Sequence, residues 1–380
     1  VKLLGVALCD ECAGTVSEAA QVVLLKFLRR NDYDVEAAVT QLTARLEWQR
    51  TFDVEAAKRE SFTEDFAGCD TILGEDVEGR ALVISVFGRI FAAIRTAILV
   101  RVTDRPVSES PARTDLDVEK VFGDPQRFLR WRVQMMEAAL ERMQPWRLGA
   151  PETLLQLHDY ADCAILNKDP RITEAVKTFS HAMWQYYPET KGRTVFINFP
   201  AIFGVLFGAL KLVLPSRTLS KFVMLGPVSP RDGSARELLG FIPPHWLPER
   251  YGGLLSDSAA ARAAAGDTDA VLPAEVITLP AGKVVTREVA LQPGKVAVRC
   301  VLRVLCKDVG FSVAVSGGTL AGGELPDKLY DEQSVVNGTL EATAGSSAIV
   351  FTLDNSYSML TSKTVLFGAV RGRVRGLLNR

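Results

Sequence analysis

The side chains best suited to catalysis in this sequence are two histidines and an aspartate near the middle of the chain. His158 and Asp159 are neighbours, and His181 follows further along. A histidine oriented by a carboxylate acts as a general base when a serine or cysteine supplies the nucleophile. However, the chain has no GxSxG motif, no P-loop and no cluster of metal-ligand residues beside them. We therefore interpret His158 and Asp159 as structural and predict no catalytic residue and no enzyme activity.

Cysteine chemistry is equally sparse. Cys9 and Cys12 form a CxxC pair, but no second Cys or His pair follows at the spacing of a zinc site. The other four cysteines lie in apolar or mixed stretches: Cys69, Cys163, Cys300 and Cys306. We expect reduced thiols, as in cytosolic proteins, with no metal and no cofactor. Zinc or redox chemistry at the CxxC pair is the alternative.

Length and composition limit the class of protein. A chain of 380 residues exceeds the size of one ordinary core, so two domains are expected. With 48% hydrophobic and 23% charged residues, the composition is that of a globular protein. The net charge of -1 provides no field to recruit nucleic acid, and no apolar run approaches the ~20 residues of a membrane-spanning helix. Any attraction to a membrane must come from local patches.

The first predicted element is a helical hairpin at residues 15–55. Residues 17–30 have helical spacing, and Ser17 is a suitable N-cap. A second helix begins after Asp34, which is also a suitable N-cap. Its apolar positions fall on one face: Val35, Ala38, Val39, Leu42 and Leu46. Both helices should therefore pack against a larger body.

Residues 65–255 alternate between strands and helices. The run ALVISVF at 81–87 is apolar throughout, as in a buried strand. Asp124 and Pro125 mark a helix start, followed by an apolar stripe at Leu129, Val133, Met136, Leu140 and Met143. Further strands are predicted at 154–157, 194–198 and 222–225, and a helix lies between the first two. This alternation predicts an α/β domain with a mainly parallel or mixed sheet.

The chain changes character after residue 255. Residues 256–270 are small and polar with a glycine, which indicates a linker. At 271–373 the apolar period becomes two, which predicts an all-β module, most simply a sandwich. One strand of it places these side chains on one face: Val296, Val298, Cys300, Leu302, Val304 and Cys306. Residues 91–114 fit none of these patterns, and we interpret them as a surface loop or a gene-model artefact.

Several motifs resemble the CRAL-TRIO lipid-transfer family. LLKFLRRNDYDVEAAVTQLTARLEWQR at 24–50 resembles its N-terminal helices. Four more motifs follow in the family's order: GRALVISVFG at 79–88, YYPETKGRTVFINFP at 186–200, LSKFVMLGP at 219–227 and LPERYGG at 247–253. RFLRWRVQMME at 127–137 is closest to patellins, and FTLDNSYSMLTSKTVLFGA at 351–369 resembles the closing strands of a GOLD domain. The resemblance implies a CRAL-TRIO α/β lipid-binding domain followed by a GOLD-type β-sandwich, the order found in patellins.

The apolar segment at residues 201–214 has two interpretations. It is apolar nearly all round, and its periodicity alone favours a core helix. In CRAL-TRIO proteins this region is the mobile gate over the lipid cavity. The resemblance therefore implies that five of its side chains form the gate and line the acyl cavity: Phe203, Leu206, Phe207, Leu210 and Val213.

The resemblance also implies a headgroup site. In phosphatidylinositol-binding members, a glutamate after the YYP turn and a lysine in the next S-K strand contact the inositol phosphate region. Glu189 and Lys221 occupy those positions here. A lysine supplies a point charge to a phosphate, and a carboxylate accepts hydrogen bonds from inositol hydroxyls. A structural ion pair or two solvated charges are the alternatives for these residues.

Two departures from the family pattern affect this site. The third basic residue of the RFLRxR pattern falls on Asn31, so Arg30 or its neighbour Arg29 is the expected substitute. The small hydroxyl residues that some members use for phosphatidylcholine fall on Leu154 and Gln156. This argues against a phosphatidylcholine site.

Taken with the resemblance, the sequence predicts a non-enzymatic carrier that binds one phospholipid, preferably a phosphoinositide, and transfers or presents it at membranes in vesicle traffic. The expected location is cytoplasmic and peripheral to membranes, with unidentified trafficking proteins as partners of the GOLD-type module. Two alternatives remain open. One is a trafficking adaptor whose pocket only senses lipid. The other is a carrier of a hydrophobic small molecule such as a tocopherol.

Overall fold

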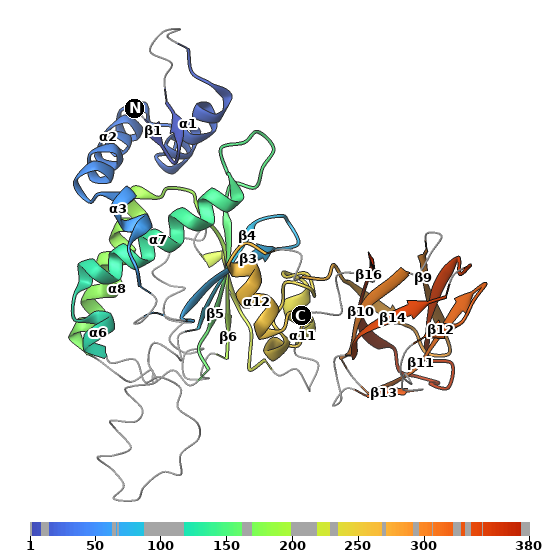
Figure 1. Ribbon diagram of the computed structural model, residues 1–380. Coiled ribbons are helices and arrows are strands. Elements are labelled where there is room, and N and C mark those ends of the chain that lie inside the picture. The colour runs from blue at the N-terminus through green and yellow to red at the C-terminus, as the bar shows by residue number, and fades with distance from the viewer. Residues whose placement is uncertain are drawn as a thin grey trace, which may run out of the picture. The chain divides into compact units, whose positions relative to one another are not determined.

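The chain forms two compact units, Val1–Pro227 and Val228–Arg380, in a computed structural model (Figure 1). The structure describes these residues: 2–8, 15–62, 66, 68–86, 118–161, 169–198, 219–228, 235–267, 271–291, 296–305, 307–321, 328–330, 336–343 and 345–373. Within this described part, no helix has both the length and the apolar character needed to cross a bilayer. The segment at 91–114 lies outside it.

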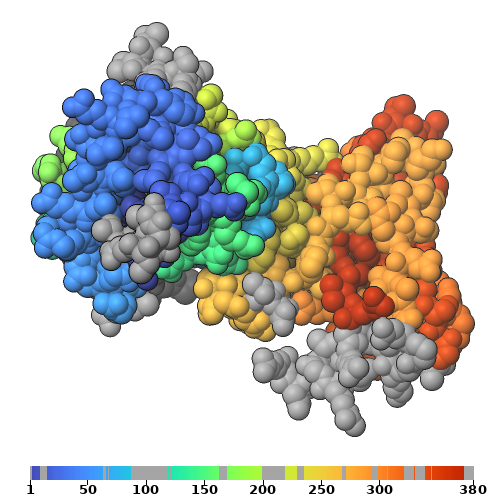
Figure 2. Space-filling model, turned by 90° about the horizontal axis from the view of Figure 1, so that it is seen from above, coloured from blue at the N-terminus to red at the C-terminus, as the bar shows by residue number. Residues whose placement is uncertain are grey.

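The first unit begins with a short hairpin and three helices. Their bounds are β1 Lys2–Leu3, β2 Val6–Ala7, α1 Glu18–Arg30, α2 Val35–Thr51 and α3 Val54–Arg59. Both predicted N-caps are present. The Ser17 hydroxyl accepts a hydrogen bond from the Ala20 amide at 3.2 Å, and the Asp34 carboxylate accepts one from the Ala37 amide at 3.0 Å. Figure 2 shows these helices, in blue, over much of the upper face of this unit.

The buried face of α2 differs from the predicted stripe. Val35 and Val39 are 65% and 56% exposed. The buried positions are Ala38, Gln41 and Arg45. The two polar side chains have partners elsewhere in the unit, which offset the loss of hydration. A periodicity based on apolar residues could not identify this face, because two of its three buried residues are polar.

A five-stranded sheet forms the centre of the first unit. Its strands lie in the order β3 Asp70–Glu75, β4 Ala81–Val86, β5 Leu154–Asp159, β6 Lys191–Ile197 and β7 Phe222–Met224. The first two strands pair antiparallel, and the remaining neighbours pair parallel. The predicted mixed sheet of an α/β domain is confirmed.

Two long helices cover one face of this sheet, α7 Pro125–Met143 and α8 Pro170–Tyr186 (Figure 1), and the short α6 Val118–Phe122 precedes them. The Asp124 carboxylate accepts a hydrogen bond from the Gln126 amide at 2.8 Å, which confirms the predicted helix start. Most of the predicted apolar stripe of α7 is buried with the inner residues of the sheet: Leu129, Val133, Met136 and Leu140 with Ala81, Val83 and Leu154.

The second unit combines short helices with a β-sandwich. The helices are α11 Ala235–Leu239, a 3-10 turn η1 Glu249–Tyr251 and α12 Asp257–Ala264. One antiparallel sheet has the order β12 Leu320–Ala321, β14 Val336–Ala342, β10 Val296–Val304, β16 Lys363–Arg373 and β8 Glu275–Leu279. The other has the order β13 Lys328–Tyr330, β11 Asp308–Ser316, β15 Ala348–Asp354 and β9 Val284–Ala290. The predicted sandwich is confirmed.

The predicted linker at 256–270 contains α12 instead of extended chain. Its alanines are the strongest helix formers, and the Ser256 hydroxyl caps the helix by accepting from the Ala259 amide at 3.2 Å. Leu254 and Leu272, on either side of α12, are buried with Val301 of β10. The compact unit that contains the sandwich begins at Val228. The family-domain boundaries of 65–255 and 271–373 stay predictions.

Candidate functional site

A cavity of about 500 Å3 lies in the first unit, between α8 and the sheet strands β5, β6 and β7. We call it the sheet cavity. Its wall is largely apolar and aromatic, with Met183, Trp184, Tyr187, Phe196 and Phe222. The ring centroids of Phe196 and Phe222 are 5.5 Å apart in an edge-to-face arrangement. The volume falls in the range of natural ligand sites.

All three predicted headgroup residues line this cavity: Arg30, Glu189 and Lys221. The Lys221 Nζ lies 3.9 Å from the Glu189 carboxylate and donates a hydrogen bond to the Lys191 carbonyl at 3.0 Å. The Arg30 guanidinium carbon lies 4.3 Å from the centroid of the Trp184 ring, a cation–π contact. The structure thus brings these side chains to one cavity, and their role in binding a headgroup stays a prediction.

Glu189 has an unusual backbone that α1 helps to hold. Its φ of 51° is in the left-handed region, where a glutamate is strained. The buried Lys26 Nζ donates to the Glu152 carbonyl at 2.7 Å and to the Glu189 carbonyl at 3.4 Å. Loss of hydration lowers the pKa of Lys26, and the Glu152 carboxylate opposes this shift. Lys26 therefore ties the predicted headgroup turn to the N-terminal helix.

A second buried connection holds Tyr187 in the cavity wall. The Glu137 carboxylate of α7 lies 3.0 Å from Arg45 of α2 and accepts a hydrogen bond from the Tyr187 hydroxyl at 2.7 Å. Arg45 and Glu137 are 1% and 5% exposed. Burial raises the pKa of Glu137, and the neighbouring Arg45 charge partly offsets that effect. This network was not predicted from the sequence. Its only local signal is one charged residue, Arg45 or Glu137, on the buried face of each helix.

The structure distinguishes the two arginines that follow Leu28. Arg29 pairs with the Glu152 carboxylate at 2.8 Å, whereas Arg30 lines the sheet cavity. Asn31, which stands where the family has a basic residue, caps α1 by donating to the Phe27 carbonyl at 2.8 Å. Arg30 is therefore the substitute that faces the cavity.

His158 and Asp159 do not form a catalytic pair. As neighbours on β5 they face opposite sides of the sheet. Burial, together with the charges of Arg132 and Lys191, lowers the pKa of His158 well below its usual value, so its imidazole is neutral at pH 7. The Asp159 carboxylate accepts from the Ala161 amide at 2.9 Å. These contacts agree with a structural role, and no group of potential metal ligands gathers within the described ranges.

Lys191 lines the sheet cavity and was not identified from the sequence. A β-bulge at the start of β6 sets its direction, because Lys191 pairs with Leu154 while Leu155 pairs with Arg193, leaving Gly192 as the extra residue. A lysine followed by glycine at a strand start was the only available signal. The predicted gate residues cannot be compared with the cavity, since Phe203, Leu206, Phe207, Leu210 and Val213 lie outside the described residues.

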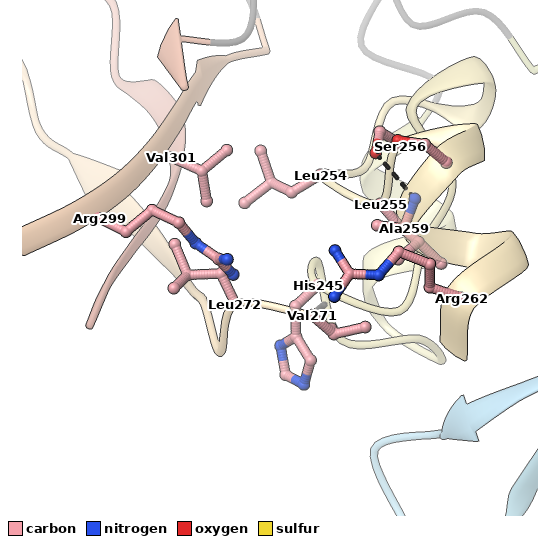
Figure 3. A pocket seen from close by; sticks show the side chains of 11 residues that line it. His245, Leu254, Leu255, Ser256, Ala259, Arg262, Val271, Leu272, Arg299 and Val301 are labelled. Carbon is pink, nitrogen blue, oxygen red and sulfur yellow. Dashed lines mark hydrogen bonds between the residues drawn. The ribbon is translucent and has the colours of Figure 1, made fainter. Parts of the chain in front are cut away.

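A second cavity, of about 180 Å3, lies within the second unit. Figure 3 shows Arg299 of β10 and Arg262 of α12 pointing into it from opposite sides. Arg262 is already paired with the Asp267 carboxylate, whose oxygen lies 2.9 Å from its Nε. This space is too small for a two-chain lipid. The sheet cavity is the candidate site because it combines an apolar and aromatic wall with the charged side chains of Arg30, Glu189 and Lys221.

The part of the chain that contains this cavity is similar to known proteins. A family model described as the CRAL/TRIO domain matches residues 66–253. Patellin-4 of Arabidopsis thaliana is 30% identical over 237 residues, which cover 62% of this chain and 38% of that protein. Phosphatidylinositol transfer protein SFH5 of Phaeosphaeria nodorum is 30% identical over 220 residues, which cover 54% of this chain and 60% of that protein. The chain thus spans less than two thirds of the length of these relatives.

A solved structure shows the same fold. The crystal structure of Sfh5 aligns with a TM-score of 0.50 at 21% identity, over 66% of this chain and 78% of that one. Together with the family match, this confirms the predicted α/β fold, of CRAL/TRIO type, for the first domain. The GOLD-type assignment of the sandwich stays a resemblance supported by its antiparallel sheets.

Proposed function

Residues 66–253 of this chain form a CRAL/TRIO domain, and from this premise we propose that the protein binds a single phospholipid, preferably a phosphoinositide, and transfers or presents it at membranes. No bond is made or broken in this activity. Binding, exchange and release of the lipid are its only steps.

The observation that carries the proposal is the composition of the sheet cavity. One set of lining residues is apolar or aromatic, including Met183 and Phe222, and suits acyl chains. Another set is charged, with Arg30, Glu189 and Lys221, and suits an inositol phosphate. A pocket that is mainly apolar with a few convergent polar groups is typical of a ligand site for an amphiphile.

The energetics explain why such a cavity is needed. Exposing acyl chains to water costs about 0.8 kcal/mol for each CH2, so a lipid leaves its bilayer only for another apolar environment. The SFH5 relatives are phosphatidylinositol transfer proteins by name, which supports the same cargo class here. We propose that residues 201–214 form the gate of this cavity.

We also propose a location and partners. The protein would act in the cytoplasm and bind membranes peripherally. Its sandwich would contact trafficking proteins, as the resemblance to GOLD modules implies. Co-flotation of the full chain with vesicles of phosphatidylcholine, with and without phosphatidylinositol, tests the membrane part. Equal flotation with both vesicles would contradict a preference for the anionic lipid.

Native mass spectrometry of the protein purified from cells tests the cargo. A bound phosphatidylinositol or phosphoinositide supports the proposal. An empty pocket favours a trafficking adaptor, and a neutral isoprenoid such as a tocopherol favours a small-molecule carrier. Both of these outcomes would overturn phospholipid transfer.

We expect Lys221→Ala to lower phosphatidylinositol transfer between vesicles about tenfold, the effect of losing one charge-assisted contact of roughly 1.5 kcal/mol. Its thermal stability should change little, because the Lys221 side chain is 32% exposed and its carboxylate contact is long. Lys177→Ala is the matched control, an exposed lysine of α8 outside the cavity lining.

The neighbouring arginines supply a second comparison for the headgroup site. Arg30→Ala should reduce transfer, whereas Arg29→Ala should not, since Arg29 is engaged by Glu152. Equal transfer by wild-type protein and Lys221→Ala would show that the headgroup assignment is wrong.

A further inference from the structure

The β-bulge at Gly192 directs the Lys191 side chain toward the sheet cavity. Paired residues of neighbouring strands share a face, so Lys191 lies on the face of its partner Leu154, and Thr194 lies on that of Gln156. Leu154 is buried in the core beneath α7, and Gln156 lines the cavity. Without the extra residue, Lys191 would share the opposite face with Arg193.

The bulge depends on a glycine. A Cβ at Gly192 would lie 2.4 Å from the Thr153 hydroxyl oxygen and 2.8 Å from the Leu154 carbonyl oxygen. Atoms cannot approach so closely, so only glycine permits this path of the chain. The direction of Lys191 is therefore a specific feature of the local sequence Lys-Gly, and the sheet would not produce it by default.

The Lys191 ammonium has cationic and aromatic neighbours. Its Nζ lies 5.2 Å from the centroid of the Phe179 ring on α8. Arg132 of α7 is close enough to act on its charge, and together with loss of hydration lowers the pKa of Lys191 to about 8, desolvation being the larger cause. Within the described part of the chain, no oxygen accepts a hydrogen bond from this Nζ.

The nearby carboxylates are engaged elsewhere. Asp70 of β3 pairs with Arg132, and the Glu189 carboxylate is 3.9 Å from Lys221. His158 of β5 is neutral at pH 7. Among the described groups, nothing balances the charge that Lys191 presents to the cavity. Proteins rarely place an ammonium in an apolar cavity without a counter-ion.

We propose that Lys191 is the counter-ion for one negative charge on the cargo, a lipid phosphodiester or carboxylate bound in the sheet cavity. The cavity would therefore select an anionic amphiphile over a zwitterionic or uncharged one. This inference rests on the proposed function of the sheet cavity as a lipid site. It adds a specificity-determining residue separate from Glu189 and Lys221.

Lipid binding by Lys191 variants tests this selection. Wild-type protein, Lys191→Met, Lys191→Arg and the control Lys177→Met are each titrated with phosphatidylcholine vesicles, with vesicles that also contain phosphatidylinositol, and with oleate. Lys191→Met should weaken capture of the anionic lipid about tenfold and leave phosphatidylcholine uptake unchanged. Lys191→Arg should retain the preference because it keeps the charge.

The three probes separate the possible outcomes. Loss with phosphatidylinositol alone identifies a phosphodiester, and loss with oleate alone identifies a carboxylate. If Lys191→Met binds both anionic lipids as tightly as wild-type protein, the counter-ion role is wrong while lipid transfer can still hold. If wild-type protein captures none of these lipids, both the counter-ion role and the proposed function are wrong.

The affinity for phosphatidylinositol should also depend on pH. In the lipid-free protein Lys191 loses its proton near pH 8. The affinity for phosphatidylinositol should therefore be highest below that pH and decline above it. The other charged or titratable groups around Lys191 are Arg132, its ion-pair partner Asp70, and His158, whose imidazole is already neutral. Lys191→Arg should abolish the decline, which separates Lys191 from Lys221 and other titrating groups. If Lys191→Arg shows the same decline, a group other than Lys191 causes the pH dependence.

Discussion

Replacement of Glu137 by leucine is expected to destabilise the protein by about 3–5 kcal/mol, the usual cost of leaving one partner of a buried ion pair alone. Arg45 would keep its charge at a position only 1% exposed. Its Nη1 already has no hydrogen-bond partner among the described residues, so the guanidinium depends on its contact with Glu137. Tyr187 would also lose the acceptor for its hydroxyl. Denaturant titration measures the change in the free energy of unfolding.

Two further variants make this result specific. Arg45→Met combined with Glu137→Leu removes both charges and should recover much of the loss, giving a large coupling in the double-mutant cycle. Glu141→Leu is the matched control on the same helix, since Glu141 pairs with Lys58 at 2.6 Å but is 56% exposed. Its cost should stay below about 1 kcal/mol. Similar losses for Glu137→Leu and Glu141→Leu would contradict a buried, coupled pair.

Lys191→Met is expected to act in the opposite direction and stabilise the lipid-free protein by about 3 kcal/mol below pH 8. The folded lysine loses its proton at about pH 8, whereas the ordinary value is 10.5. Below pH 8 both folded and unfolded states carry the charge, and the folded state bears the whole cost of burying it. Between those values the unfolded state binds more protons, so wild-type stability rises with pH. The advantage of methionine should therefore vanish above about pH 10.5.

Thermal and denaturant unfolding across this pH range measure the effect. Lys177→Met makes the same change on the exposed side of α8 and should alter stability by less than about 0.5 kcal/mol. A stabilising substitution that weakens binding is typical of a functional residue, because function retains a group that folding disfavours. If Lys191→Met instead destabilises the protein at pH 7, Lys191 is a structural residue.

Much of the fold could be predicted because its signals are local. Ser17, Asp34 and Asp124 cap the helices that they were predicted to start, since each carboxylate or hydroxyl meets an amide within three residues. The alternation along β10 placed Val298 and Cys300 in the sandwich core correctly, because a strand has a fixed period of two. Family motifs added Glu189 and Lys221, and the structure brings them to one cavity.

Apart from α12, the unpredicted features depend on partners that are distant along the chain. Nothing in the sequence distinguishes Lys26 from an ordinary surface lysine, yet its acceptors are the carbonyls of Glu152 and Glu189. Arg45 can occupy a buried position of α2 because Glu137 of α7 pairs with it. Lys191 reaches the cavity through a bulge, and the register of a bulge is set by the neighbouring strand. The Lys-Gly pair at the start of β6 is a local signal, but it does not specify the residues with which β6 pairs.

The hydrogen bonds and the ion pair that α1 and α2 make with the rest of the unit determine where the chain can be truncated without unfolding. A fragment that began at residue 66, where the family match begins, would lack both Lys26 and Arg45. Glu137 would then be left in an apolar interior without its cation, and the turn that carries Glu189 would lose its anchor. The N-terminal helices and the sheet therefore belong to a single cooperative folding unit. Removal of the N-terminal helices should therefore unfold the part of the chain that forms the cavity, and no shorter folded domain with an intact cavity is expected.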